Sequence, residues 1–99
     1  MTESINRLTV LGARRQVRLF QKGNWASSLG ARHAQVLENS PGRPAWQFES
    51  EGVPLASLQW LSRHWPRLTF LLDFELEAQR IKGLAKAGGG ELEHHEISY

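Results

Sequence analysis

The clearest strand pattern in the sequence is Leu68–Glu77, which reads LTFLLDFELE. One series of alternate residues is wholly apolar: Leu68, Phe70, Leu72, Phe74 and Leu76. The series between them is mostly polar: Thr69, Leu71, Asp73, Glu75 and Glu77. Alternation with a period of two residues is the pattern of a strand that buries one face and exposes the other to water, as strands of antiparallel sheets do. The stretch therefore predicts an antiparallel sheet with one buried face and one open, acidic face.

Seven further elements are predicted from apolar periodicity and from Gly and Pro signals. In chain order they are a strand (Ile5–Leu11), a helix (Ala13–Gln21), two strands (Arg32–Glu38 and Ala45–Glu49), a helix (Leu55–Trp65) and two closing strands (Arg80–Ala87 and Glu91–Ser98). A turn at Gly88–Gly90 joins the last two strands into a hairpin. Residues Asn24–Gly30 are small and polar around Trp25, so this segment predicts a loop.

The order strand, helix, strand, strand, helix, strand is that of a split βαβ arrangement. We therefore expect an α+β fold, a ferredoxin-like sandwich whose two helices cover one face of an antiparallel sheet, with a C-terminal hairpin added to it. A chain of 99 residues has room for one such core and not for two, so a single domain is expected over residues 1–99.

Composition narrows the class of protein. The chain has no cysteine, which excludes disulfides, thiolate nucleophiles and Cys-based zinc sites. Residues 1–10 carry no apolar core behind a basic start, and no stretch approaches the apolar run of about 20 residues that a membrane helix needs. We expect a cytoplasmic protein with no membrane partner.

Basic residues gather in the first half of the chain. Residues 1–50 carry seven Lys/Arg against three Asp/Glu, and residues 51–99 carry five against seven. Four of the cations lie opposite the apolar stripe of the first predicted helix: Arg14, Arg15, Arg18 and Lys22. Such a face can bind phosphates or an acidic protein surface. The alternative is a helix face that only contacts water, which has the same sequence pattern.

Two tryptophans are candidate binding residues. Trp60 lies off the apolar face of the second predicted helix, where an exposed Trp can anchor a partner. The alternative is that the segment holding Trp25 covers it. The alternation of apolar and polar residues predicts that four other aromatic residues lie on buried strand faces: Trp46, Phe48, Phe70 and Phe74. This argues against the mode of RNA binding in which bases stack on an open sheet, since the opposite faces carry Gln47, Glu49, Asp73 and Glu75.

The stretch Glu91–Glu96, ELEHHE, contains candidate metal ligands in Glu93, His94 and His95. On a strand, His94 and His95 point to opposite faces, so one ion cannot take both without a bulge. The alternative is a solvated strand with adventitious metal affinity. Gly88–Gly90 lacks the Lys-Ser/Thr that follows a phosphate-binding loop, and no Ser-centred nucleophile elbow is present. We expect no cofactor and no enzymatic activity.

Four short motifs resemble those of the YubB ferredoxin-like domain family, bacterial proteins often found on plasmids and phages. They are Asn24–Ser27, Val53–Pro54, Trp65–Leu68, and Glu77 followed by Ile81–Gly83. The resemblance implies a ferredoxin-like fold and supplies no activity, since the family has no established biochemical function.

The leading functional hypothesis is therefore a small, non-enzymatic binding or assembly module that binds a protein partner or a second copy of itself. One alternative is nucleic-acid binding through the basic first helix, which the resemblance to mobile-element proteins favours. Another is a metal-dependent enzyme built around His94 or His95.

Overall fold

The strand expected from LTFLLDFELE is present as β4 (Thr69–Leu76), near the middle of a six-stranded antiparallel sheet. The computed structural model describes residues 2–99. The other strands are β1 (Glu3–Leu11), β2 (Arg32–Glu38), β3 (Ala45–Glu51), β5 (Ile81–Gly88) and β6 (Glu91–Ser98). The helices described are α1 (Arg14–Lys22), α2 (Trp25–Ser28), α3 (Leu55–His64) and a short 3-10 helix η1 (Glu77–Gln79).

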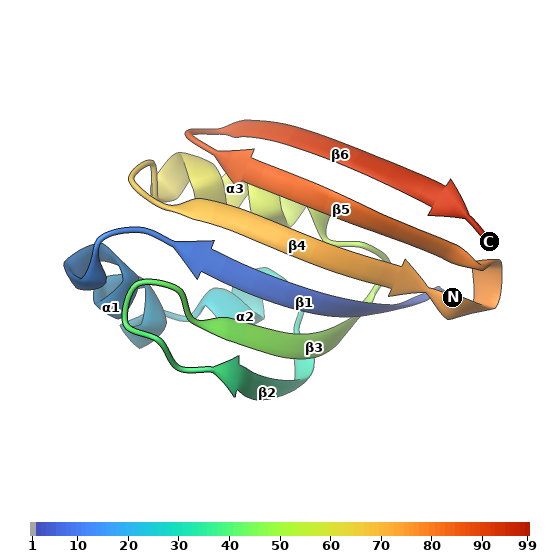
Figure 1. The fold of residues 1–99 in the computed structure, drawn as a ribbon, viewed down its shortest axis with the longest axis horizontal. Coiled ribbons are helices and arrows are strands. Elements are labelled where there is room, and N and C mark those ends of the chain that lie inside the picture. The colour runs from blue at the N-terminus through green and yellow to red at the C-terminus, as the bar shows by residue number, and fades with distance from the viewer. Residues whose placement is uncertain (1) are drawn as a thin grey trace.

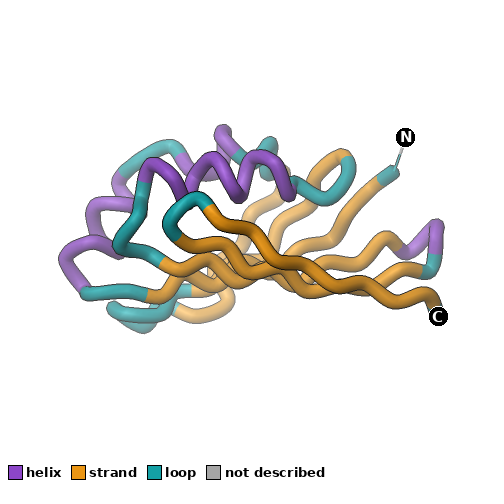
Figure 2. The backbone as a smooth tube through the Cα atoms, turned by 90° about the horizontal axis from the view of Figure 1, so that it is seen from above, coloured by secondary structure: helices purple, strands orange, loops and turns teal. Residues whose placement is uncertain are grey.

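The strands lie in the order β2-β3-β1-β4-β5-β6, and every neighbouring pair is antiparallel (Figure 1). In the view of Figure 2, α1, α2 and α3 lie on one side of the sheet and leave the other side uncovered. The α+β class, the antiparallel sheet and the closing hairpin are confirmed. The two edges of the sheet are β2 and β6.

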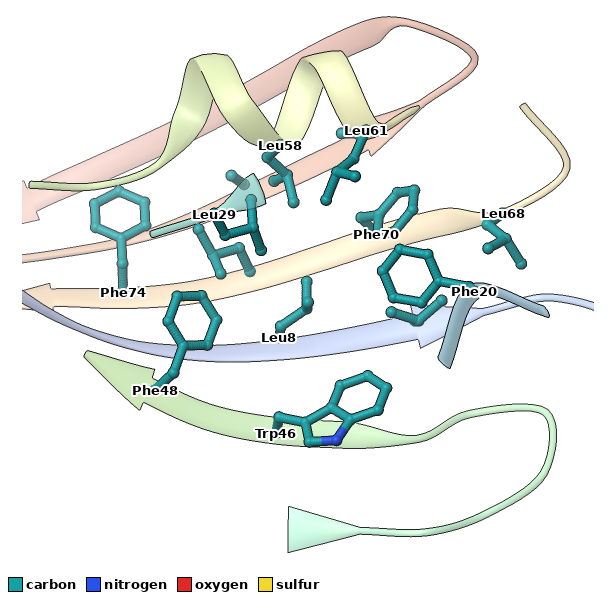
Figure 3. Close-up of a cluster of buried hydrophobic side chains, with 14 of the residues drawn as sticks. Leu8, Phe20, Leu29, Trp46, Phe48, Leu58, Leu61, Leu68, Phe70 and Phe74 are labelled. Carbon is teal, nitrogen blue, oxygen red and sulfur yellow. The ribbon is translucent and has the colours of Figure 1, made fainter. Parts of the chain in front are cut away.

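The core fills the space between the helices and the covered face of the sheet (Figure 3). Phe70, Leu72 and Phe74 of β4 are at most 4% exposed, as the alternation predicts. Phe20 of α1 packs edge-on against Phe70, with ring centroids 5.3 Å apart, and against Trp65, at 5.5 Å. The end of α1 and the end of α3 therefore meet over the sheet.

The predicted loop over Asn24–Gly30 is wrong at its centre, where the chain forms the four-residue helix α2. Trp25 is the reason, because its ring packs on Trp46 and Phe48 with centroids 4.8 and 5.9 Å away. Leu29 is 3% exposed and completes this contact with the core. A segment that reads as polar is thus held against the sheet by two apolar side chains.

A buried polar cluster lies between β1 and β3 on the covered face. Ser4, Asn6 and Ser50 are at most 2% exposed. Ser4 Oγ donates a hydrogen bond to Asn6 Oδ1 at 2.8 Å, and Asn6 Nδ2 donates to Ser50 Oγ at 2.9 Å. Ser50 Oγ donates in turn to the carbonyl of Gly52 at 2.8 Å. Asn6 is opposite Phe48 and reaches Ser50 diagonally across the strand pair, so its hydrogen bond helps to specify the register of β1 on β3.

No helix within residues 2–99 is long and apolar enough to cross a membrane.

Candidate binding surfaces

Strand register sorts the side chains of the sheet onto two faces, since residues directly opposite one another in antiparallel strands point to the same side. Buried Phe74 is opposite Gly83, which is opposite Glu96; these lie on the helix-covered face. Glu75 is opposite Lys82, which is opposite Ile97. The second row lies on the uncovered side, which we call the open face.

The open face carries charges of both signs. Asp73 and Glu75 lie there as expected, but Asp73 is opposite Arg7 of β1 and Glu75 is opposite Lys82 of β5. The expectation of an acidic face was based on the residues of each strand by itself, without those of its neighbours. The neighbouring strands supply cations that cross-strand pairing places beside the carboxylates.

The open face is also hollowed. A hollow of about 450 Å³ lies over β1, β4, β5 and β6. Its lining includes Ile5, Arg7, Asp73, Lys82, Leu84 and Ile97. Leu84 and Ile97 are 60% and 67% exposed, so this face combines apolar contacts with paired charges.

Tyr99 closes one end of the open face. Its backbone N–H donates to the carbonyl of Arg80 at 2.8 Å, and its phenol donates to the Glu75 carboxylate. The side chains of Arg80 and Lys82 lie 5.6 and 5.2 Å from the ring centroid. The hydrogen bond to Glu75 raises the pKa of the Tyr99 phenol, because a negative neighbour disfavours the phenolate.

The two edges of the sheet differ in regularity. Two register shifts interrupt the pairing of β2 with β3, and His33 has a positive φ of 54°. By contrast, β6 pairs with β5 through an unbroken register from Glu91 to Ser98. Bulges twist a strand edge and so prevent further pairing, whereas a regular edge leaves its backbone groups open to another strand.

The candidate metal ligands do not come together. His95 is opposite Leu84 on the open face, and His94 is opposite Ala85 on the covered face, as expected for adjacent strand residues. Glu93 is opposite Lys86. Within residues 2–99, no three His, Cys, Asp or Glu side chains are grouped so as to hold a metal ion.

The basic residues of α1 are all exposed: Arg14, Arg15, Arg18 and Lys22. They lie opposite Val17 and Phe20, which are buried, as the helical pattern predicts. Trp25 packs into the core, whereas Trp60 stays 49% exposed. The ring of Trp60 stacks on that of His64 with centroids 3.9 Å apart, and His64 Nδ1 lies 2.9 Å from the Trp60 carbonyl oxygen.

A second hollow adjoins Trp60. It measures about 340 Å³ and lies between α1, α2 and α3. Its lining is rich in aromatic rings and includes Phe20, Trp25, Trp60, His64 and Trp65. The sequence left open whether the segment holding Trp25 covers Trp60; in the structure both residues border one hollow and Trp60 stays about half exposed. Nothing in the sequence signals how α2 meets α3.

Searches of protein-family models, curated proteins and solved structures found no match to this chain.

Proposed function

We propose that this protein is a non-enzymatic assembly module that associates with a second copy of itself through the outer edge of β6. The observation that supports the proposal is the contrast between the edges: β2 is irregular, whereas β6 is an unbroken eight-residue strand. Pairing two β6 edges would extend the sheet across the dimer and satisfy backbone groups that now face water.

Two-fold symmetry restricts the register of such a pair. An axis perpendicular to the sheet opposes β6 to an antiparallel copy and keeps each side chain on its own face. If the axis passes at His95, His94 lies opposite Glu96 of the second copy. If it passes at His94, His95 lies opposite Glu93 of the second copy. Either register places a histidine opposite a carboxylate twice, so that an imidazole N–H can donate to the carboxylate, and cross-strand polar pairs contribute about 0.2–1 kcal/mol each.

We also propose that the fold is ferredoxin-like. The order β2-β3-β1-β4, with helices on one face, supports a ferredoxin-like unit to which β5 and β6 are added. We also propose kinship with the YubB family and a bacterial plasmid or phage source, which the four sequence motifs support. A cytoplasmic location is proposed as well, and it fits the absence of cysteine.

Substitutions on the two edges test the proposed interface. His94→Glu with His95→Glu puts carboxylates opposite carboxylates in both registers. Ala34→Glu with Gln35→Glu is the matched control, since it adds two carboxylates to exposed residues of the other edge strand. We expect light scattering across a concentration series to give a dimer for the wild type and the control, and a monomer for the β6 variant. A wild-type monomer at every concentration, or a β6 variant that still dimerises, would refute the proposed interface.

A further inference from the structure

The structure keeps the carboxylates of this protein out of its helical layer. All ten Asp and Glu residues lie on strands or on η1. The helical layer, α1 to α3 with the turn that follows α3, carries only cations: Arg14, Arg15, Arg18, Lys22, Arg63 and Arg67. Six of the twelve Lys/Arg residues thus face outward from a surface without a carboxylate.

These six cations have no anionic partner in the described part of the chain. The ion pair present in residues 2–99 joins Arg32 to Glu3, on β2 and β1. All six side chains are exposed. Unpaired cations on one layer attract a polyanion and release its counterions when it binds.

Trp60 and His64 form an exposed stacked pair on this layer, which we call the aromatic platform. Lys22 immediately precedes Gly23 and Asn24, which line the hollow between the helices. Arg63 follows Trp60 by three residues, one turn along α3. The exposed Trp60 ring, stacked on His64, therefore lies on the same layer as cations from two helices.

We propose that this layer binds single-stranded nucleic acid, with Trp60 stacking on a base and the cations of α1 and α3 contacting phosphates. A single strand fits better than a duplex because its bases are free to stack on a side chain, while those of a duplex are already stacked. It fits better than an acidic protein segment because the hollow is lined by flat aromatic rings, which stack on bases. This site is on the opposite side of the sheet from the open face and does not depend on the proposed dimer.

Fluorescence anisotropy with a labelled oligo-dT of about 12 nucleotides tests the proposal, a length within the site sizes of single-strand binders. We expect Trp60→Ala to raise the Kd by about fivefold or more, and Trp60→Phe to restore most of the affinity. An unchanged Kd in Trp60→Ala would overturn the stacking role, since Trp60 is at the surface and its loss leaves the core intact.

The charges are tested by two matched double variants. Arg18→Gln with Lys22→Gln removes two cations from the helical layer, and Lys82→Gln with Lys86→Gln removes two from the sheet. The first should lower the slope of log K against log salt by about 1.4, and the second should leave it unchanged. Equal effects of the two pairs would show attraction by net charge alone and overturn the site.

Three competitors identify the class of ligand. Unlabelled oligo-dT should displace the probe, while a duplex of equal length and polyglutamate should compete far more weakly. Equal competition by the duplex would overturn the preference for single strands. Equal competition by polyglutamate would mean that the surface recognises acidic polypeptides instead.

Discussion

Gly83 of β5 lies against the tip of the Phe74 ring of β4. A Cβ atom at position 83 would stand 2.1 Å from Phe74 Cζ and 2.7 Å from the carbonyl oxygen of His95. The two residues are opposite one another in the β4–β5 register, so the absent side chain makes room for the buried ring. The absent side chain also leaves room for the His95 carbonyl of β6 beside β5.

Gly83→Ala should therefore lower the free energy of unfolding by about 1–3 kcal/mol, the usual cost of overpacking. Gly88→Ala is the matched control on the same strand, since its Cβ would meet only Thr69 Oγ1, at 3.9 Å. Urea denaturation monitored by circular dichroism measures both. Equal stability of the two variants would contradict the close packing at Gly83.

Asn6→Ala should destabilise the protein by about 1–3 kcal/mol, because it removes partners from buried Ser4 and Ser50 hydroxyls. Gln47→Ala, at an exposed position of β3, should change stability by about 0.5 kcal/mol or less. The same denaturation experiment compares them. A neutral Asn6→Ala would mean that the polar cluster does not hold β1 to β3.

Trp46→Ala should cost about 3–5 kcal/mol, because Trp46 is 7% exposed and packs against Trp25. Trp60→Ala should cost far less, since half of that side chain is in water. Thermal melting of the two variants distinguishes a core tryptophan from a surface one. Comparable losses would place Trp60 in the core and remove the basis for a stacking platform.

The Tyr99 phenol should titrate above its ordinary pKa of about 10, because its hydrogen bond to Glu75 is lost on ionisation. A pKa raised in the folded state stabilises the protein below pH 10, and this contribution disappears as the pH rises through the folded value. Tyr99 is the only tyrosine, so ultraviolet absorbance of the phenolate reports it directly. Glu75→Gln should bring the pKa back towards 10; an unchanged titration would contradict the contact.

The strands of the core could be predicted from sequence because their pattern is local. Phe70, Leu72 and Phe74 are buried for the reason that their alternation gives, and β2 was predicted with the bounds that the structure shows. The helix α2 could not be predicted, since only the tertiary contacts of Trp25 and Leu29 order that polar segment.

The candidate surfaces were predictable only in part. The basic side of α1 and the position of Trp60 off the apolar face of α3 followed from helical periodicity, which left open whether the segment of Trp25 covers Trp60. The pairing of Asp73 with Arg7, and the layer without carboxylates, depend on how distant segments lie beside each other. Neither relation has a signature within a single stretch of sequence.

Hydrogen exchange of the backbone amides of β6, measured by mass spectrometry at low and high protein concentration, tests the proposed assembly most directly. If β6 forms the interface, protection in Glu91–Ser98 rises with concentration, while Arg32–Glu38 exchanges at the same rate throughout. Exchange in β6 that is independent of concentration, or added protection in β2 instead, would contradict it.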